Sequence, residues 1–535
     1  MRVWLSRVLL AALLAASAAE AKRFHDDDPL EREPKPRNAD KVRPRKLSDY
    51  YDFFSNVFAR PGERHTPKKQ IPAQAVNTLG EAPDSAWYTN RHYRNPMTIE
   101  QLVSGPGSGN PPAADGVWRV VGAKSEGITP GFQIIDSRGR RYLLKFDPKE
   151  NPEIATSADV IGSKIFHALG YNVPENYLVY FSPEQLVLDK DVQLKDTLGR
   201  ERRMTGRDLT ELLMKVSWAA GRKYRGTASL LLPGQPVREF RYYGSRRDDP
   251  NDIVPHEHRR DLRGLSVFCA WLGHDDSRAI NTLDMLVEEN GVSYVKHHLI
   301  DFGSILGSAS NGPNTPRSGF EYIFEFKKAA ARFFSFGLAV PKWARADFGD
   351  ISSVGILEAD AFDAENWVAE YPNAAFSNRL PDDGFWAARQ VMAFTDEQIR
   401  AIVKTGGYTD PRAEQYVAEC LIKRRDKIGR AFFARVLPLD RFAVRDGRLV
   451  FEDLAVKHKF IASQSYSTQW SAFDNDTERL TPLAGETSPE APAVKIADGG
   501  FLAASIRGED AKKTVTVYLR KRGGRLDVVG VDRNW

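Results

Sequence analysis

The chain has 535 residues, with 76 Lys and Arg against 71 Asp and Glu, so its formal net charge is only +5. Hydrophobic residues make up 42% and charged residues 27%, which is ordinary for a globular protein. Because the basic residues are interspersed with acidic ones, we expect no nucleic-acid partner. A chain of this length can bury a large core, and it predicts roughly two to four domains.

The first 21 residues have the pattern of a cleavable signal peptide. Arg2 and Arg7 precede an apolar stretch, and Ala19-Glu20-Ala21 matches a small-x-small cleavage site, which predicts a cut before Lys22. No later stretch approaches about 20 uninterrupted apolar residues, so no transmembrane segment is expected in the mature chain. No cysteine lies near the cleavage site to carry a lipid anchor. We therefore expect an exported protein, either secreted or periplasmic.

Residues 22–82 are rich in Pro, Lys, Arg and Asp, which predicts an extended, partly disordered lead-in. The aromatic run Tyr50-Tyr51-Asp52-Phe53-Phe54 is a candidate anchor within it. A Gly- and Pro-rich stretch at 104–116 separates the lead-in from the first strong strand pattern. Folded structure is therefore expected to begin close to this stretch.

Three short strands are predicted at 117–121, 131–136 and 141–146. The loop between the first two carries Ser125 and Gly127, whose backbone amides are candidates to cradle phosphate groups, because small residues let the main chain approach closely. Lys145 lies near the end of the third strand. This part of the chain is therefore the candidate nucleotide-binding region.

Helices are predicted at 155–169 and 259–272 from their apolar stripes, and residues 322–438 are expected to be mostly helical. Further strands are predicted at 174–181 and within 226–243. Beyond residue 439 the pattern becomes strand-like again, at 449–451, 500–506, 514–519 and 525–531. The chain is therefore expected to pass from a β-rich part to a helical part and then to a second β-rich part.

Two segments in the middle of the chain carry the clearest chemistry. His274, Asp276 and Asn281 follow the spacing His-x-Asp-x-x-x-x-Asn, and Asp301-Phe302-Gly303 follows the next predicted strand, after a hairpin with Glu289-Asn290-Gly291 at its tip. In protein kinases these positions hold an Asp that meets the acceptor hydroxyl, followed by an Asn and an Asp that hold metal ions. The order and spacing therefore predict a phosphotransfer site.

Phosphoryl transfer requires mainly positioning and charge neutralisation from the protein. Lys145 is predicted to contact the nucleotide phosphates, and Glu153, at the entrance to the following helix, to pair with Lys145 and fix its position. Asp276 is predicted to orient or deprotonate the acceptor. Asn281 and Asp301 are predicted to hold Mg²⁺ or Mn²⁺ through their oxygen atoms.

The sequence resembles the atypical kinase group that includes HipA-like kinases, type II phosphatidylinositol 4-kinases and the secretory-pathway Golgi casein kinases. The resemblance covers roughly residues 118–307. It rests on Lys145-x-Asp147-Pro148, Glu153, residues 168–174, residues 276–281 and Ile300-Asp301-Phe302-Gly303. In that group the metal-binding Asp often lies in Asp-Asn-Gly, so the Asp-Phe-Gly of this chain is closer to ordinary protein kinases.

The resemblance implies an α+β, bilobal kinase-like fold at 83–438, with a β-rich N-lobe at about 117–243 and a helical C-lobe at about 255–438. A small β-rich C-terminal module is expected at 439–535. The implied activity is transfer of a phosphoryl or nucleotidyl group from ATP or another nucleotide to a protein, lipid or glycan acceptor. The alternative is a non-catalytic, kinase-like envelope or extracellular binding protein.

Several other residues have more than one interpretation. Cys269 and Cys420, the only cysteines, are either two buried thiols or one disulfide between helices. The acids and histidines of 246–260 suggest either a metal site or turn and helix-capping roles. The sequence has no Gly-x-Ser-x-Gly, no His-Glu-x-x-His and no dinucleotide fingerprint after a strand, so hydrolase and dehydrogenase functions have no motif to support them.

Overall fold

The computed structural model describes residues 22–535 except 46, 67, 124–130, 196–200, 336–337, 339, 484–488 and 493–495. These residues form two compact units. The larger consists of Arg32–Ala75 and Ala82–Phe432, and the smaller consists of Val76–Glu81, Phe433–Trp535 and the residues before Arg32. Among the described residues no helix has both the length and the apolar character needed to cross a membrane. The predicted signal peptide lies outside the described residues.

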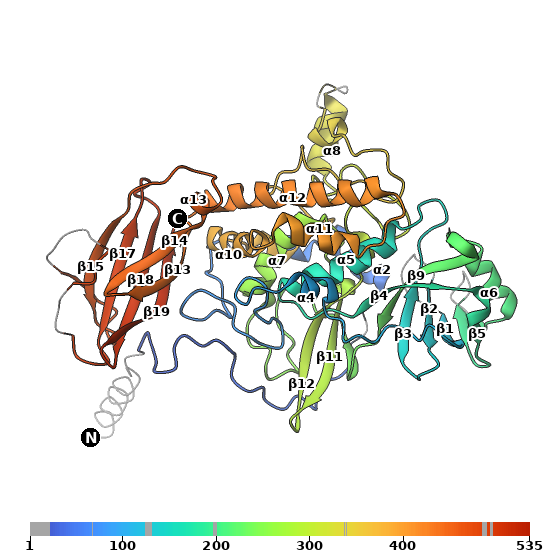
Figure 1. Ribbon diagram of the computed structural model, residues 1–535, viewed down its shortest axis with the longest axis horizontal. Helices are drawn as coiled ribbons and strands as arrows, with labels where there is room; N and C mark the ends of the chain where they lie inside the picture. Colours follow the sequence, from blue (N-terminus) through green and yellow to red (C-terminus); the bar gives the residue numbers. More distant parts are fainter. Residues whose placement is uncertain are drawn as a thin grey trace, which may run out of the picture. The chain divides into compact units, whose positions relative to one another are not determined.

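The first part of the larger unit is a seven-stranded sheet with the strand order β4-β9-β3-β2-β1-β5, in which β8 also pairs with β9 (Figure 1). The strands are β1 Trp118–Ala123, β2 Gly131–Ile135, β3 Arg141–Lys145, β4 Asn176–Phe181, β5 Leu186–Leu188, β8 Trp218–Ala219 and β9 Lys223–Leu230. The three strands predicted between residues 117 and 146 are therefore confirmed. The pieces between β5 and β8 are β6 Gln193–Lys195, β7 Glu201–Arg203 and α6 Gly206–Leu213.

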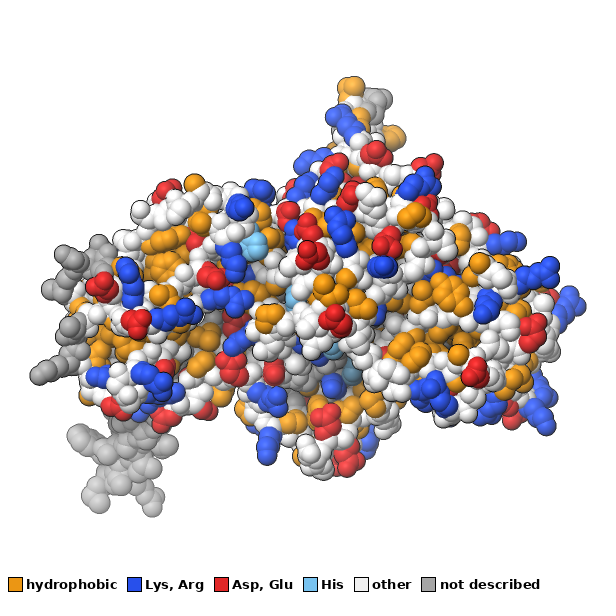
Figure 2. Space-filling view, in the orientation of Figure 1, with side chains coloured by type: hydrophobic (Ala, Val, Ile, Leu, Met, Phe, Trp, Pro, Cys, Tyr) orange, Lys and Arg blue, Asp and Glu red, His pale blue; other side chains and the backbone are white. Residues whose placement is uncertain are grey.

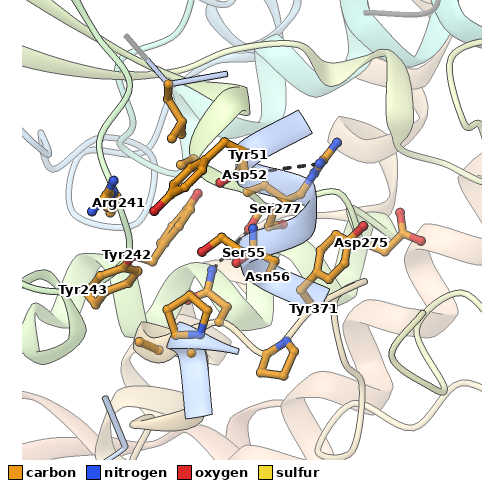
Figure 3. A pocket seen from close by; sticks show the side chains of 18 residues that line it. Tyr51, Asp52, Ser55, Asn56, Arg241, Tyr242, Tyr243, Asp275, Ser277 and Tyr371 are labelled. Atoms are coloured by element: carbon orange, nitrogen blue, oxygen red, sulfur yellow. Dashed lines mark hydrogen bonds and ion pairs between the residues drawn. The ribbon is translucent and has the colours of Figure 1, made fainter. Parts of the chain in front are cut away.

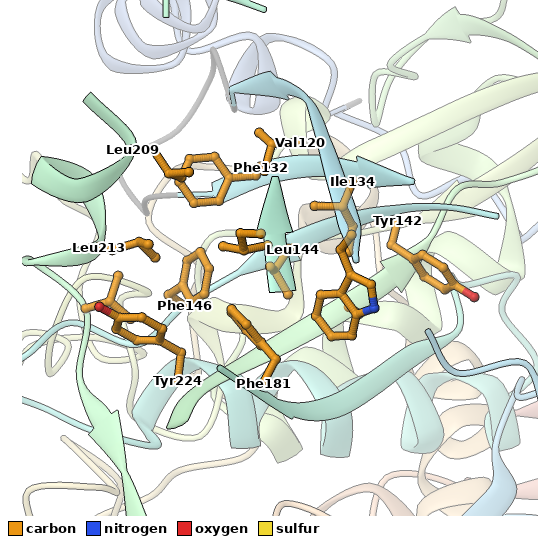
Figure 4. Close-up of a cluster of buried hydrophobic side chains, with 14 of the residues drawn as sticks. Val120, Phe132, Ile134, Tyr142, Leu144, Phe146, Phe181, Leu209, Leu213 and Tyr224 are labelled. Carbon is orange, nitrogen blue, oxygen red and sulfur yellow. The ribbon is translucent and has the colours of Figure 1, made fainter. Parts of the chain in front are cut away.

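One face of this sheet carries the core of the lobe (Figure 4). Phe132 and Ile134 on β2, and Tyr142 and Leu144 on β3, are fully buried. Residues two apart in a strand point to the same side of the sheet, so these four side chains share one face. The alternation of apolar residues in the sequence therefore fixes the register of β2 against β3.

Helix α5, Ile154–Ala168, packs against β4 and β9. Its first turn is held by Asp147, whose carboxylate accepts hydrogen bonds from the amides of Ala155 and Thr156, both at 2.8 Å. This interaction satisfies two backbone donors that the helix itself leaves open. The helix predicted at 155–169 is confirmed.

The second part of the larger unit is mainly helical. Its longer helices are α7 Arg260–Leu272, α10 Pro381–Val391, α11 Asp396–Lys404 and α12 Pro411–Phe433. Shorter pieces are α2 Asp49–Phe54, η1 Ser55–Ala59, α3 Pro61–Arg64, α4 Ile99–Ser104, η4 His256–His258, η5 Ala279–Asn281, η6 Phe302–Ser304, α8 Phe326–Phe334, η7 Lys342–Arg345 and α9 Ala374–Ser377. Helices α7 and α10 pack closely, with Gly264 of α7 against the buried ring of Trp386.

Two expectations for this part need correction. Residues 322–438 were expected to be mostly helical, but between α8 and α9 the chain has only the short helix η7 among its described residues, because Pro341, Gly349 and Gly355 interrupt the helical pattern. The predicted strand stretch at 226–243 divides into β9 and β10, Gln235–Arg238. Strand β10 joins β11, Thr282–Glu289, and β12, Val292–Leu299, in a separate sheet.

The smaller unit is β-rich, as expected for the C-terminal module. It contains the hairpin of β13, Leu439–Arg445, and β14, Arg448–Asp453, the short helix α13, Leu454–Lys457, and a five-stranded antiparallel sheet. In spatial order this sheet is formed by β16 Leu480–Pro482, β15 Ser467–Phe473, β17 Phe501–Arg507, β18 Thr514–Arg522 and β19 Arg525–Asn534. A β-rich lobe, a helical lobe and a β-rich C-terminal module confirm the predicted α+β fold class.

The lead-in was expected to be partly disordered, but its beginning is packed in the smaller unit. Phe24 is buried in an aromatic cluster with Phe473, Phe501 and Tyr518. Next to it, Arg23 pairs with Asp532 at 2.7 Å. The first residues after the predicted cleavage site are therefore part of the core of the C-terminal module.

We predict that Phe24→Ala lowers the free energy of unfolding of the smaller unit by about 3 kcal/mol, because it removes a buried aromatic ring and leaves a cavity. Urea unfolding followed by tryptophan fluorescence measures this change, since Trp470 lies in the core of the same unit. Leu30→Ala, at a side chain that is 38% exposed, is the control and should have little effect. Equal effects of the two substitutions would contradict the prediction.

Candidate functional site

Lys145, at the end of β3, lies between two carboxylates that come from different parts of the chain. Its Nζ donates to Asp159 Oδ2 at 3.2 Å and to Asp301 Oδ1 at 3.0 Å. Burial alone would lower the pKa of Lys145, but the two carboxylates outweigh it and raise the pKa above its ordinary value. The lysine is therefore held in its charged form.

Asp159 is the functional residue that the sequence analysis missed. It lies within α5, and besides Lys145 it accepts a hydrogen bond from the amide of Phe302 at 3.1 Å. Burial raises the pKa of Asp159 against the opposing charge of Lys145, and the charge of Asp301 adds to the rise. Asp159 is the only acidic residue between Ile154 and Ala168. A single acidic residue in the helix that follows the strand of Lys145 could have identified Asp159 as the partner of the lysine.

The predicted pairing of Lys145 with Glu153 is wrong. Glu153 precedes the first turn of α5 with φ at 73°, and its carboxylate lies 3.5 Å from Arg225 and accepts a hydrogen bond from the amide of Thr409 at 3.0 Å. The physical reason is position along the helix: α5 brings Asp159, more than one turn further on, to the end of β3. Glu153 instead links the start of α5 to the segment before α12.

Asp301 is held in place by the residues that follow it. Its backbone is left-handed, with φ at 61°, which is uncommon for a residue with a side chain. Phe302 is fully buried and stacks on Phe166 of α5, with ring centroids 4.9 Å apart. At Gly162 a Cβ atom would lie only 2.7 Å from that of Phe302. The close approach of α5 therefore fixes Asp301.

Asn281 and Asp301 lie at the same end of the β11–β12 hairpin. Thr282 pairs with Leu299 in the strand register, and the amide of Ile300 donates to the carbonyl of Asn281 at 3.0 Å. This register brings together the two residues predicted to hold a metal ion. Asn281 Nδ2 donates to the carbonyl of Asp276 at 2.5 Å, which leaves its Oδ1 without a protein partner among the described residues.

The donor set suits a hard divalent cation. Carboxylate and amide oxygens are the ligands that Mg²⁺ and Mn²⁺ accept, and Mg²⁺ sites usually combine one or two protein ligands with water and substrate phosphates. The described residues contain no group of three or more His, Cys, Asp or Glu side chains able to hold a metal ion without such help. The acids and histidines of 246–260 form no such group, and His256 pairs with Asp252 at 2.8 Å.

The loop from Gly273 to Asn281 presents two adjacent aspartates in different ways. Asp276 is partly exposed, and its Oδ1 accepts from Arg278 Nε at 2.5 Å. Asp275 is buried and accepts hydrogen bonds from Asn314 at 3.0 Å and Ser318 at 2.5 Å. Asp276 is therefore the more accessible of the two carboxylates, whereas Asp275 anchors the segment that follows Gly303.

Burial and neighbouring carboxylates perturb the acids around this loop. Burial, followed by the charges of Asp276 and Asp275, raises the pKa of Glu370 to about 8. Burial raises the pKa of Asp275 to about 6, with the Asp276 charge adding to the shift. Such shifts are common at functional sites because they result from like charges held together. His274 has a lowered pKa because it is buried, and its ring lies edge-on to Phe166.

A small cavity lies beside the same loop (Figure 3). Its volume is about 40 Å³, and its walls include Asn56, Tyr242, Ser277 and Tyr371. The aromatic run proposed as an anchor contributes to this wall as helix α2, whose Asp52 lies 3.8 Å from Arg278. The cavity is too small for a nucleotide, because it holds little more than one or two water molecules.

Ser125 and Gly127, the predicted phosphate-cradling residues, lie outside the described residues. Cys269 and Cys420 are both buried and are free thiols, in agreement with the first of their two interpretations. The structure therefore brings together Lys145, Asp159 and Asp301 directly, and joins Asn281 to Asp276 and to the strand end that precedes Asp301.

Searches with the sequence found no matching family model and no matching curated protein. Among solved structures, the chain is similar to the Helicobacter pylori proinflammatory kinase CtkA, with 11% identity, a TM-score of 0.30, and coverage of 59% of this chain and 98% of that one. It is also similar to a Golgi casein kinase, with 12% identity, a TM-score of 0.31, and coverage of 78% and 94%. Hydra Fam20 with sugar gives 12% identity, a TM-score of 0.30, and coverage of 65% and 94%. Similarities this weak carry no functional argument.

We predict that Gly162→Ala destabilises the larger unit by about 1–3 kcal/mol, because the new methyl group would press against Phe302 and Ile305. Gly206→Ala is the matched control, since it also lies in a helix but has open space around it, and it should be neutral or slightly stabilising. Thermal unfolding of the two variants measures the difference. If Gly162→Ala is as stable as the control, the close packing of α5 on the Asp301 loop is not as described.

We predict that Glu370 makes stability fall as pH rises from about 5 to 8. Its folded-state pKa of about 8 exceeds its ordinary value of 4.5, so the native state binds more protons than the unfolded state over this range. Glu370→Gln should therefore flatten the pH dependence of the unfolding midpoint in EDTA, whereas Glu419→Gln, at an exposed site, should leave it unchanged. If the unfolding midpoint of Glu370→Gln depends on pH as strongly as that of the wild-type protein, the raised pKa of Glu370 is contradicted.

Proposed function

We propose that this chain is a metal-dependent phosphotransferase of the kinase type, which moves a phosphoryl group from a nucleotide to a hydroxyl-bearing acceptor. The observation that carries the proposal is the position of Lys145 between Asp159 and Asp301. One cation is held beside two acids from two elements, and Asn281 lies at the end of the adjoining hairpin. A site with more carboxylates than cations suits a ligand that brings a divalent cation with its phosphates.

Each residue has a distinct role in this proposal. Lys145 binds the phosphates, and Asp159 fixes the position of Lys145 in place of the predicted Glu153. Asp301 and Asn281 would hold Mg²⁺ or Mn²⁺, which when bound neutralises charge on the phosphates. Ser125 and Gly127 remain candidates to contact the phosphates through their backbone.

Asp276 orients the acceptor. The acceptor oxygen bonds to the terminal phosphorus as the bond from that phosphorus to the bridging oxygen breaks, and the hydroxyl proton passes to the Asp276 carboxylate. Because phosphoryl transfer depends mainly on positioning, the ion pair of Asp276 with Arg278 is compatible with this role.

The proposal includes ATP as the nucleotide, a protein, lipid or glycan as the acceptor, and export of the mature chain. The alternative remains a non-catalytic binding protein that keeps the same fold. It is favoured by the engagement of Asp276 by Arg278, since a carboxylate paired this closely accepts a proton less readily. Nucleotide binding and turnover must therefore be measured separately.

We predict that Mn²⁺ with ADP stabilises the mature protein by about 3 kcal/mol at about 100 times the dissociation constant. Asp301→Asn should lose most of this stabilisation, because it removes a predicted metal ligand, whereas Asp115→Asn, at an exposed residue elsewhere in the larger unit, should retain it. A thermal shift with metal and nucleotide, added separately and together, measures the effect. Equal shifts in the two variants would contradict the assignment of Asp301.

We predict that Asp276→Asn keeps the metal-dependent shift but lowers turnover of ATP, measured as transfer to the protein itself or to water, by about 100-fold or more. Loss of both properties would mean that Asp276 helps to bind the nucleotide. Binding without turnover in the wild-type protein, with each metal, would favour the non-catalytic alternative. Absence of binding would end the phosphotransferase proposal.

A further inference from the structure

Helix α8 lies on an excursion of the chain between Gly303 and α9, and it projects from the body of the larger unit (Figure 1). The base of the excursion is closed by pairing of Gly319 with Val368 and by a hydrogen bond from the amide of Ile323 to the carbonyl of Glu370 at 2.8 Å. None of the residues of α8 is buried. The helix is therefore held at its base and exposed along its length.

The amphipathic character of α8 is inverted relative to a normal surface helix. Phe326, Phe333 and Phe334 lie seven and eight positions apart, on one face, and are 73%, 78% and 74% exposed. Toward the protein, Arg332 donates to Glu321 at 2.5 Å and lies 5.8 Å from the centre of the Trp343 ring. Arg332 thus packs on the protein, whereas the three phenylalanine side chains of the helix are exposed to solvent.

The exposed apolar side chains continue beyond the helix. The group, here called the α8 patch, consists of Phe324, Phe326, Phe333, Phe334, Leu338 and Val340. Figure 2 shows apolar side chains at the end of this projection, next to Lys and Arg side chains. Single exposed apolar residues are normal, but six large exposed apolar side chains in one short segment mark an interaction surface.

The segment that carries the α8 patch is rich in basic residues. Residues 320–346 contain Lys327, Lys328, Arg332, Lys342 and Arg345 against Glu321 and Glu325, a net charge of five minus two, or +3. Lys327, Lys342 and Arg345 are exposed. Phenylalanine on one side with Lys and Arg around it is the composition of helices that lie in the interface of a bilayer containing anionic lipid.

A second copy of the chain fits this surface less well. Two patches meeting each other would bring together two regions of charge +3, which repel. A helix of nine residues at the end of a projection also offers much less than the roughly 800 Å² per partner that a stable protein interface buries. A bilayer requires no matching shape, and it supplies both the apolar layer and the negative charge.

We propose that the α8 patch docks the protein on the surface of an anionic lipid bilayer, with its phenylalanines among the lipid headgroups and acyl chains. The proposal does not depend on the phosphotransferase assignment. It has a geometric consequence for the site, because the amide of Glu370 donates to the carbonyl of Asp275 at 2.9 Å and Ser318 donates to the Asp275 carboxylate. The base of the docking excursion is thus bonded to the loop that carries Asp276.

The test is sedimentation of the mature chain, residues 22–535, with vesicles of phosphatidylcholine alone or with about 30% phosphatidylglycerol. The wild-type protein should bind the anionic vesicles, and binding should weaken as salt is raised. Phe333→Ser/Phe334→Ser should weaken binding by about ten-fold or more, because it removes two of the apolar anchors. Ile253→Ser, at an apolar residue that is 75% exposed elsewhere, is the control and should bind as the wild type does.

A second variant separates charge from apolar burial. Lys327→Glu/Arg345→Glu should remove the preference for anionic vesicles and the salt dependence. Both double variants should keep the wild-type unfolding midpoint, because all four side chains are exposed. Their response to Mn²⁺ and ADP should also be unchanged, so failure of docking is distinguishable from failure of the phosphotransferase proposal.

Three results would overturn the proposal. The first is no retention on anionic vesicles, and the second is equal retention of the wild-type protein and the Phe333→Ser/Phe334→Ser variant. The third is a concentration-dependent dimer in sedimentation velocity that the same variant abolishes, which would assign the patch to a second copy of the chain.

Discussion

The site depends on one ammonium group shared by two carboxylates. Burying ions costs free energy, and that cost is recovered only when the ions are paired and their remaining hydrogen bonds are satisfied. Lys145 meets this requirement by contacting Asp159 and Asp301, and Asp159 also receives the amide of Phe302. Strand β3, helix α5 and the turn after β12 must therefore all be in place together. The same arrangement leaves the site with excess negative charge, which is the condition under which a divalent cation binds.

A second buried cation joins the sheet lobe to the helical lobe. Arg225 of β9 donates to Ser157 of α5 at 2.7 Å and to the carbonyls of Gly406 and Gly407 at 2.7 Å and 2.5 Å. It also lies 3.5 Å from Glu153. This explains why Glu153 does not pair with Lys145. Its carboxylate pairs with Arg225, where α5 meets the chain between α11 and α12. The two cations lie on neighbouring strands and have different partners. Lys145 of β3 pairs with the carboxylates of the candidate site, and Arg225 of β9 connects the two lobes.

The sequence predicted the residues whose positions follow from local pattern. Lys145 was predicted from its position on the third strand. Asn281 was predicted from the spacing His-x-Asp-x-x-x-x-Asn, and Asp301 from the Asp-Phe-Gly motif after the next strand. Asp159 was missed because its neighbours belong to an apolar helix, and only the path of α5 over the end of β3 shows what it contacts. Glu153 was predicted as the partner of Lys145 because it lies at the start of the next helix. Position along the chain does not determine which acid of a helix reaches a neighbouring strand.

The segment between Phe302 and α9 is where sequence periodicity was least informative. The α-helix predicted in this segment forms only at α8. The apolar side chains of α8 are exposed, so an amphipathic pattern did not indicate burial there. The segment is nevertheless not a separate appendage, because Asn314 and Ser318 bind Asp275 and Glu370 lies beside Asp276. Asp275 is buried where it connects this segment to the loop, and Asp276 beside it is partly exposed. Asp275 therefore supports the loop, whereas Asp276, the aspartate that the spacing selected, is the more exposed of the two.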